Sequence, residues 1–182
     1  DNADDPAEAA LARIGTAVAK YWNTKRCPSL VVEALECHGG PGYVEESIMP
    51  RLYREAPLNS IWEGSGNVMG LDVLRAMGRE AEATPALMTE IEKARGNHPN
   101  LDRAIDELRD ELVDKEGLEG RMRMVTEMMA LTLQGALLTC HGDIAVADAF
   151  CASRLAPRYR GAFGTLPKGL DLDSIIGRAL PS

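Results

Sequence analysis

The sequence predicts an all-α protein, an antiparallel helical bundle with an additional C-terminal helical segment. Apolar residues recur at helical spacing along most of the chain, and no strand-like alternation is found. Ala, Leu, Met and Glu, which suit helices, are abundant, whereas aromatic residues make up only 4%. Hydrophobic residues account for 45% of the 182 positions, enough for a packed core.

The helices are bounded by local start and stop signals. Asp5 is a candidate cap and Pro6 a first-turn proline for the first helix. Glycines and a proline at 39–42 end the second helix, and the segment "GNHPN" and Gly117 separate later ones. The tail after 161 is predicted to be irregular. The predicted helices cover 6–24, 28–38, 47–56, 65–82, 85–95, 100–114, 117–140 and 144–161.

Composition argues against several classes of function, although it leaves a local basic patch open. The net charge of -8 argues against broad attraction to nucleic acid or to an anionic membrane. No apolar run is long enough for a membrane helix, and the four cysteines lack the spacing of a metal site. We therefore expect no membrane partner, no metal, and reduced thiols in a cytoplasmic protein. Because the chain begins without Met, we expect it to be part of a longer polypeptide.

The motif "CHGGPGY" at 37–43 is the first candidate site. Consecutive glycines allow the backbone to approach a ligand closely, because no Cβ intervenes. They also end helices, so both a helix C-cap and a phosphate-binding turn are compatible with Gly39 and Gly40.

The motif "WEGSGN" at 62–67 is the second candidate site. If the Trp62 indole partly desolvates Glu63, it makes that carboxylate a better base. The glycines that follow begin a helix whose free N–H groups suit an anion. By itself, however, a glutamate before a helix is also compatible with an ordinary surface turn.

Together the two motifs resemble the C-terminal helical domain of the acyl-CoA dehydrogenase superfamily. The double glycine of "GGPGY" followed some twenty residues later by "WEGS" is typical of that superfamily. The run "RLYREAPLNSIWEGSGN" at 51–67 resembles its DNA-alkylation-response, AidB-like branch. The close resemblance covers 30–77. It implies a division into a partial dehydrogenase domain, 1–80, and an additional helical segment with an irregular tail, 81–182.

The resemblance implies a flavoprotein oxidoreductase. Glu63 matches the base that removes the α-proton of an acyl-CoA while hydride passes to FAD. Trp62 stands where Tyr is common, and its larger ring would narrow the acyl pocket. Gly39 and Gly40 match a turn that approaches the flavin pyrophosphate, usually from a neighbouring subunit. The positions of Ser65 and Asn67 match contacts to the flavin nucleotide. The chain alone is expected to bind FAD weakly and to be inactive.

Two rival functions follow from the same resemblance. In the alkylation-response branch, a basic residue at the position of Arg75 is associated with double-stranded DNA, so Arg75 is a candidate phosphate contact. The family also forms tetramers through this region, so a helical homo-oligomerisation domain is the third possibility.

Overall fold

The computed structural model describes residues 4–157 and 161–179, and its regular elements are helices throughout these ranges. The chain separates into two compact units. Unit 1 contains residues 1–84 and 117–127, and unit 2 contains residues 85–116 and 128–182. The sequence-based division at 80/81 assigned all of 81–182 to one segment, whereas the contacts place the first turns of α7 (Leu118–His141) in unit 1.

Unit 1 is built on α1 (Pro6–Cys37), a helix of 32 residues. Its cap is the one expected, because the Asp5 carboxylate accepts a hydrogen bond from the Ala7 N–H at 2.9 Å. The predicted break between 24 and 28 is wrong, since α1 continues through Pro28. A proline removes one backbone hydrogen bond from a helix interior. Contacts with α2, α3, η1 and α4 along α1 outweigh that local loss.

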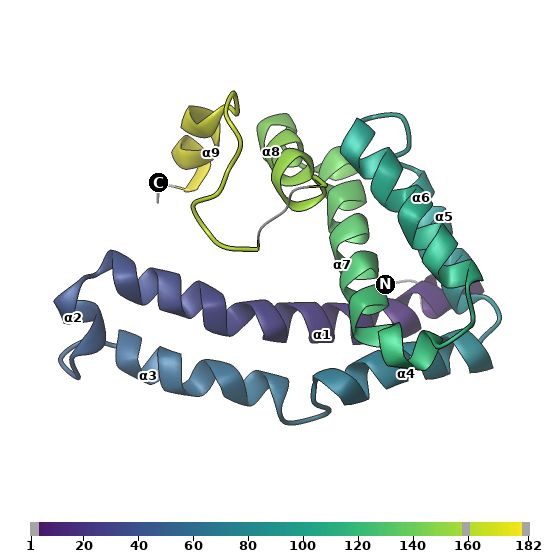
Figure 1. The fold of residues 1–182 in the computed structure, drawn as a ribbon, viewed down its shortest axis with the longest axis horizontal. Helices are drawn as coiled ribbons and strands as arrows, with labels where there is room; N and C mark the ends of the chain where they lie inside the picture. The colour runs from purple at the N-terminus through teal and green to yellow at the C-terminus, as the bar shows by residue number, and fades with distance from the viewer. Residues whose placement is uncertain (1–3, 158–160, 180–182) are drawn as a thin grey trace. The chain divides into compact units, whose positions relative to one another are not determined.

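The rest of unit 1 returns along α1 as a helical hairpin (Figure 1). Its elements are α2 (Gly40–Tyr43), α3 (Met49–Glu55), the 3₁₀ helix η1 (Ala56–Ser60) and α4 (Gly66–Arg79). Buried Gly42 fixes the turn, because a Cβ there would lie 2.2 Å from the Leu35 carbonyl oxygen.

The core of unit 1 lies between α1, α4 and the first turns of α7. Its fully buried residues include Ile14, Val73 and Val125. An ion pair between Arg13 and Asp72 at 3.0 Å joins α1 to α4 beside this core. The hairpin thus has one well-packed end, near the N-terminus of α1.

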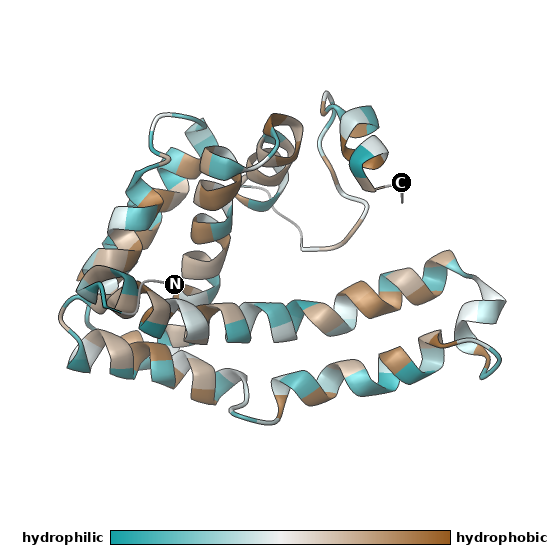
Figure 2. Ribbon diagram, turned by 180° about the vertical axis from the view of Figure 1, so that it is seen from behind, coloured by the Kyte–Doolittle hydropathy of each residue, from teal (hydrophilic) through white to brown (hydrophobic). Residues whose placement is uncertain are grey.

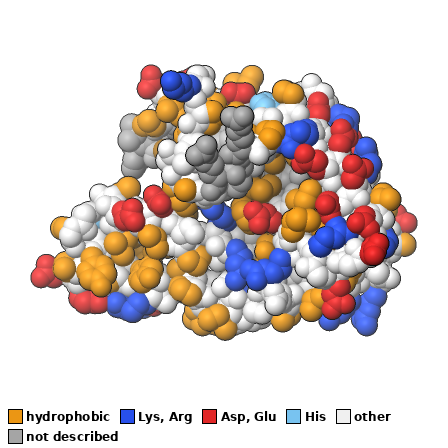
Figure 3. Space-filling view, in the orientation of Figure 1, with side chains coloured by type: hydrophobic (Ala, Val, Ile, Leu, Met, Phe, Trp, Pro, Cys, Tyr) orange, Lys and Arg blue, Asp and Glu red, His pale blue; other side chains and the backbone are white. Residues whose placement is uncertain are grey.

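The other end of the hairpin, around α2 and α3, carries an exposed apolar surface. Figure 2 colours hydrophobic positions along these helices, and Figure 3 shows hydrophobic side chains gathered at this end. Its large members are between 41% and 76% exposed: Leu30, Tyr43, Val44, Ile48, Leu52, Tyr53, Leu58 and Ile61. Exposed apolar surface of this extent is typical of a region that associates with other protein surfaces.

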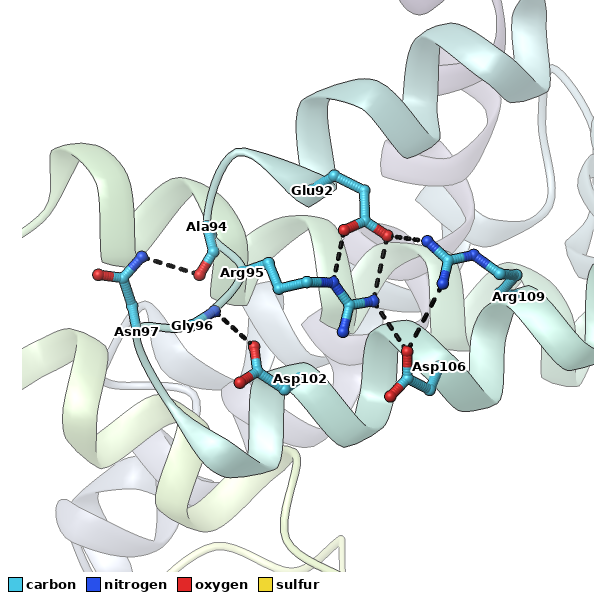
Figure 4. A network of polar contacts seen from close by, with 8 residues as sticks. All are labelled: Glu92, Ala94, Arg95, Gly96, Asn97, Asp102, Asp106 and Arg109. Carbon is cyan, nitrogen blue, oxygen red and sulfur yellow. Dashed lines mark hydrogen bonds and ion pairs between the residues drawn. The ribbon is translucent and has the colours of Figure 1, made fainter.

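Unit 2 contains most of α5 (Ala83–Glu92), α6 (Pro99–Val113), the rest of α7, α8 (Ile144–Arg154) and α9 (Leu172–Ala179). A polar network closes the turn between α5 and α6 (Figure 4). In it Arg95 pairs with Glu92 at 2.6 Å and with Asp106 at 2.8 Å. The Gly96 N–H donates to Asp102 at 2.8 Å, which fixes the predicted break at "GNHPN".

The C-terminal part of unit 2 differs from the prediction in two ways. The helix predicted for 144–161 ends at Arg154, before Pro157; the expected continuation over 158–160 lies outside the described residues. The tail is not wholly irregular, because α9 forms after Asp171. The Asp171 carboxylate accepts hydrogen bonds from the Ser174 N–H at 3.1 Å and from the Ser174 hydroxyl at 2.7 Å. This local cap starts α9 within a segment whose glycines and prolines had indicated an irregular tail. Within residues 4–157 and 161–179, none of the helices combines the length and hydrophobicity that a membrane span requires.

Candidate functional site

The loop between η1 and α4 has an unusual backbone at Glu63. Its φ is 55°, and Glu63 is the one residue other than glycine with positive φ among residues 4–157 and 161–179. Gly64 follows with φ 113°. A side chain with a Cβ disfavours the left-handed region by about 1–2 kcal/mol. The loop therefore holds Glu63 in a conformation that glycine would adopt more readily.

Hydrogen bonds fix this loop on both sides of Glu63. The N–H groups of Ile61 and Trp62 donate to the Leu58 carbonyl at 2.9 and 3.2 Å. From α1, the Lys20 ammonium donates to the carbonyl oxygens of Trp62 at 2.9 Å and of Gly64 at 2.5 Å. Lys20 was not among the predicted site residues, because no local pattern distinguishes this lysine from others on a helix surface.

The Glu63 carboxylate is exposed. Trp62 is 55% exposed, so the described part of the chain does not provide the desolvation that we expected from the indole. The carboxylate is accessible to a molecule that approaches the loop. Any further shielding of Glu63 must come from a bound ligand or another protein surface.

Ser65 and Asn67 lie at the N-terminus of α4, directly after this loop. Ser65 is the extended N-cap residue, and its side chain makes no capping hydrogen bond. The Asn67 side-chain oxygen accepts a hydrogen bond from Arg123 at 3.4 Å, and both residues line a cavity of about 370 Å³ within unit 1. The Ser65 hydroxyl and first-turn N–H groups of α4 thus suit polar or anionic groups of a ligand.

Gly39 and Gly40 lie at a different place in the hairpin, after the end of α1. Gly39 has φ 62°, and a Cβ built on either glycine would have no neighbour within 4 Å. Between Lys20, which contacts the Glu63 loop, and Cys37, α1 advances by 17 residues, or about 25 Å at ~1.5 Å per residue. The structure therefore does not bring the double glycine and Glu63 together within one chain (Figure 1).

Arg75 lies on α4, and its guanidinium donates to Asp72 at 3.0 Å. Arg13 pairs with the same carboxylate, and hydrogen bonding to Arg13 lowers the pKa of Asp72. Arg75 is 53% exposed, but a neighbouring acid already partly neutralises its charge. A role for Arg75 in binding DNA stays a prediction.

Glu127, on the part of α7 that belongs to unit 1, is a carboxylate that the sequence analysis did not identify. Burial raises its pKa, and the nearby cations Arg26 and Arg123 oppose that effect. Helical spacing alone could not find it, since one of the cations near it, Arg26, lies on α1 and far from it in the sequence.

Comparisons with known proteins identify the family. Residues 2–78 match the family described as "Acyl-CoA dehydrogenase, C-terminal domain". Residues 2–78 thus form a C-terminal helical domain of the acyl-CoA dehydrogenase superfamily. This confirms the fold class predicted from the sequence.

Individual relatives agree with this assignment. The chain is 40% identical over 158 residues to AidB of Escherichia coli strain K12, matching 87% of this chain and 29% of AidB. It is 33% identical over 130 residues to acyl-CoA dehydrogenase family member 11 of Caenorhabditis elegans, matching 71% of this chain and 20% of that protein. The crystal structure of ACDH-11 from C. elegans in complex with C11-CoA superposes on this chain with a TM-score of 0.74 and 28% sequence identity. The superposition covers 84% of this chain and 31% of the ACDH-11 chain. The chain therefore spans less than a third of each of these relatives.

Proposed function

We propose that this chain supplies the catalytic base and part of the cofactor site of a flavin-dependent acyl-CoA dehydrogenase of its relatives' length. The left-handed backbone of Glu63 is the observation that carries the proposal. A glycine would relieve the local strain, so the glutamate side chain has a role that outweighs it. A carboxylate in an exposed loop is suited to accept a proton from a substrate.

The proposed reaction is α,β-dehydrogenation of an acyl-CoA thioester. A Glu63 carboxylate oxygen takes the α-proton, and FAD, when bound, supplies the hydride acceptor. Exclusion of water by the substrate would strengthen the base, because desolvation disfavours a charged carboxylate. The acyl-CoA class is supported by the C11-CoA named in the ACDH-11 structure. We place the exposed Trp62 indole beside the acyl chain, where it would limit the width of the pocket.

The proposed cofactor contacts fall into two groups. Ser65 and Asn67 would hold one flavin nucleotide at the start of α4, where a hydroxyl, an amide and first-turn N–H groups can bind it. Gly39 and Gly40 offer an open backbone turn for a pyrophosphate. Since about 25 Å of α1 separates the groups, we propose that they contact different flavins in a homo-oligomer. Association would also cover the apolar surface around α2 and α3.

A flavin-bleaching experiment tests the proposed base. The flavoprotein that contains this chain should lose its flavin absorbance when a medium-chain acyl-CoA is added anaerobically. The variant Glu63→Gln should retain its flavin but bleach at least about a hundredfold more slowly, the loss typical of a general base. Glu55→Gln, which changes an exposed glutamate on α3, should bleach like the wild type. Bleaching of the Glu63 variant at the wild-type rate would remove Glu63 from this role.

A further inference from the structure

The Lys20 side chain binds the backbone carbonyls of the two residues that flank Glu63, Trp62 and Gly64. Its ammonium donates to the Trp62 carbonyl at 2.9 Å and to the Gly64 carbonyl at 2.5 Å. These two acceptors are 42 and 44 positions from Lys20 in the sequence. An ammonium has three N–H donors and no acceptor, so one lysine can bind both oxygens at once.

Lys20 itself is held on a rigid part of the hairpin. Its neighbours Val18 and Tyr21 are buried, and its backbone carbonyl accepts a hydrogen bond from the Thr24 hydroxyl at 2.8 Å. The side chain therefore connects the packed helix α1 to a loop that is otherwise exposed. Such a connection can transmit the rigidity of a core helix to a functional group on a loop.

The contacts of Lys20 match the strained conformation of the loop. Two consecutive residues, Glu63 and Gly64, have positive φ, and the carbonyls that Lys20 binds belong to Trp62 and Gly64. Binding both oxygens fixes the orientation of the peptides that precede and follow the left-handed pair. Without this clamp, the Glu63 backbone could relax toward the commoner negative φ, and the carboxylate would change direction.

We propose that Lys20 is a positioning residue that holds the Glu63 carboxylate in its reactive direction. The inference rests on the proposed function of Glu63, since it concerns how the carboxylate of that base is oriented. Lys20 binds backbone oxygens and transfers no proton in the reaction. Its loss should lower turnover, because even small displacements of a reacting group slow a reaction strongly.

The clamp can be measured in this chain without any reaction. Carbonyl ¹³C resonances of Trp62 and Gly64 report whether their oxygens accept hydrogen bonds. In Lys20→Met, which keeps a long side chain without the ammonium, both resonances should shift upfield. Lys25→Met is the matched control, because Lys25 is on the same helix and lies against Gly66 at the start of α4; it should leave both resonances unchanged. Unshifted resonances in Lys20→Met would overturn the proposal.

The wild-type chain gives a second measurement that requires no stable variant. The ammonium protons of Lys20 should exchange with water more slowly than those of exposed Lys168, because two of them are bonded to carbonyl oxygens. Equal exchange rates for these two lysines would overturn the clamp even if Lys20→Met fails to fold.

Kinetics in the flavoprotein separate failure of this inference from failure of the proposed function. Lys20→Met should lower kcat by about tenfold or more with little change in KM, and Lys20→Arg, which keeps a cation, should restore part of kcat. Upfield shifts in the chain together with unchanged kcat would refute positioning while leaving Glu63 as the base. Normal bleaching by Glu63→Gln would instead refute the base, and the carbonyl shifts would still report the clamp.

Discussion

The left-handed backbone of Glu63 makes a specific prediction about stability. Glu63→Gly should be more stable than Glu63→Ala, because alanine keeps the Cβ that disfavours φ 55° and glycine does not. Both variants remove the carboxylate. Their difference therefore isolates the backbone from any loss of side-chain interactions.

The expected difference follows from two opposing terms. Relief of the left-handed conformation stabilises the glycine variant by about 1–2 kcal/mol. The larger conformational freedom of glycine in the unfolded chain offsets about 0.5–1 kcal/mol of this. The net preference for glycine at 63 is thus about 1 kcal/mol, or ~2–4 °C in Tm for a chain of this size.

Urea unfolding followed by circular dichroism would measure this difference as a change in midpoint at constant slope. Glu33, inside α1, is the matched control position. In a helix interior, glycine is about 1 kcal/mol less favourable than alanine. The order of the two variants should therefore be opposite at 33 and at 63. If Glu63→Gly is no more stable than Glu63→Ala, the loop does not hold Glu63 in a strained conformation, and the main support for its catalytic role is lost.

Two further predictions concern unit 1. Gly42→Ala should lower the stability of the chain by ~1–3 kcal/mol, because the new Cβ would lie 2.2 Å from the Leu35 carbonyl oxygen. Gly40→Ala is the control, because a Cβ there has open space around it, and it should change stability little. Thermal unfolding measures both variants, and equal effects would contradict the close approach at Gly42. Hydrogen bonding to Arg13 lowers the pKa of Asp72 in the folded state. The pairing therefore stabilises the fold at pH values above the pKa of the unfolded Asp72 carboxyl, and this stabilisation is lost as pH falls through the lower pKa of the folded state. Asp72→Asn should therefore be less stable at neutral pH and lose less stability on acidification, and parallel pH–stability curves for variant and wild type would disprove the pairing.

Local signals in the sequence were sufficient for the fold class and for most helix boundaries. Asp5 caps α1, and the turn at 96–97 separates α5 from α6, as the pattern predicted. Errors arose where local and tertiary effects differ. Pro28 indicated a break that packing along α1 overrides, and the glycines and prolines of the tail concealed the Asp171 cap of α9.

The candidate site shows the same division between local and tertiary information. The sequence by itself determined the helical architecture, the family resemblance, and the identity of Glu63 and the glycine turn as motifs, because periodicity and motif spacing are properties of neighbouring residues. Only the tertiary structure decided the left-handed conformation of Glu63, the contact with Lys20 and the separation of the two motifs along α1. These depend on contacts between residues tens of positions apart, which the folding of the hairpin creates and no local pattern encodes.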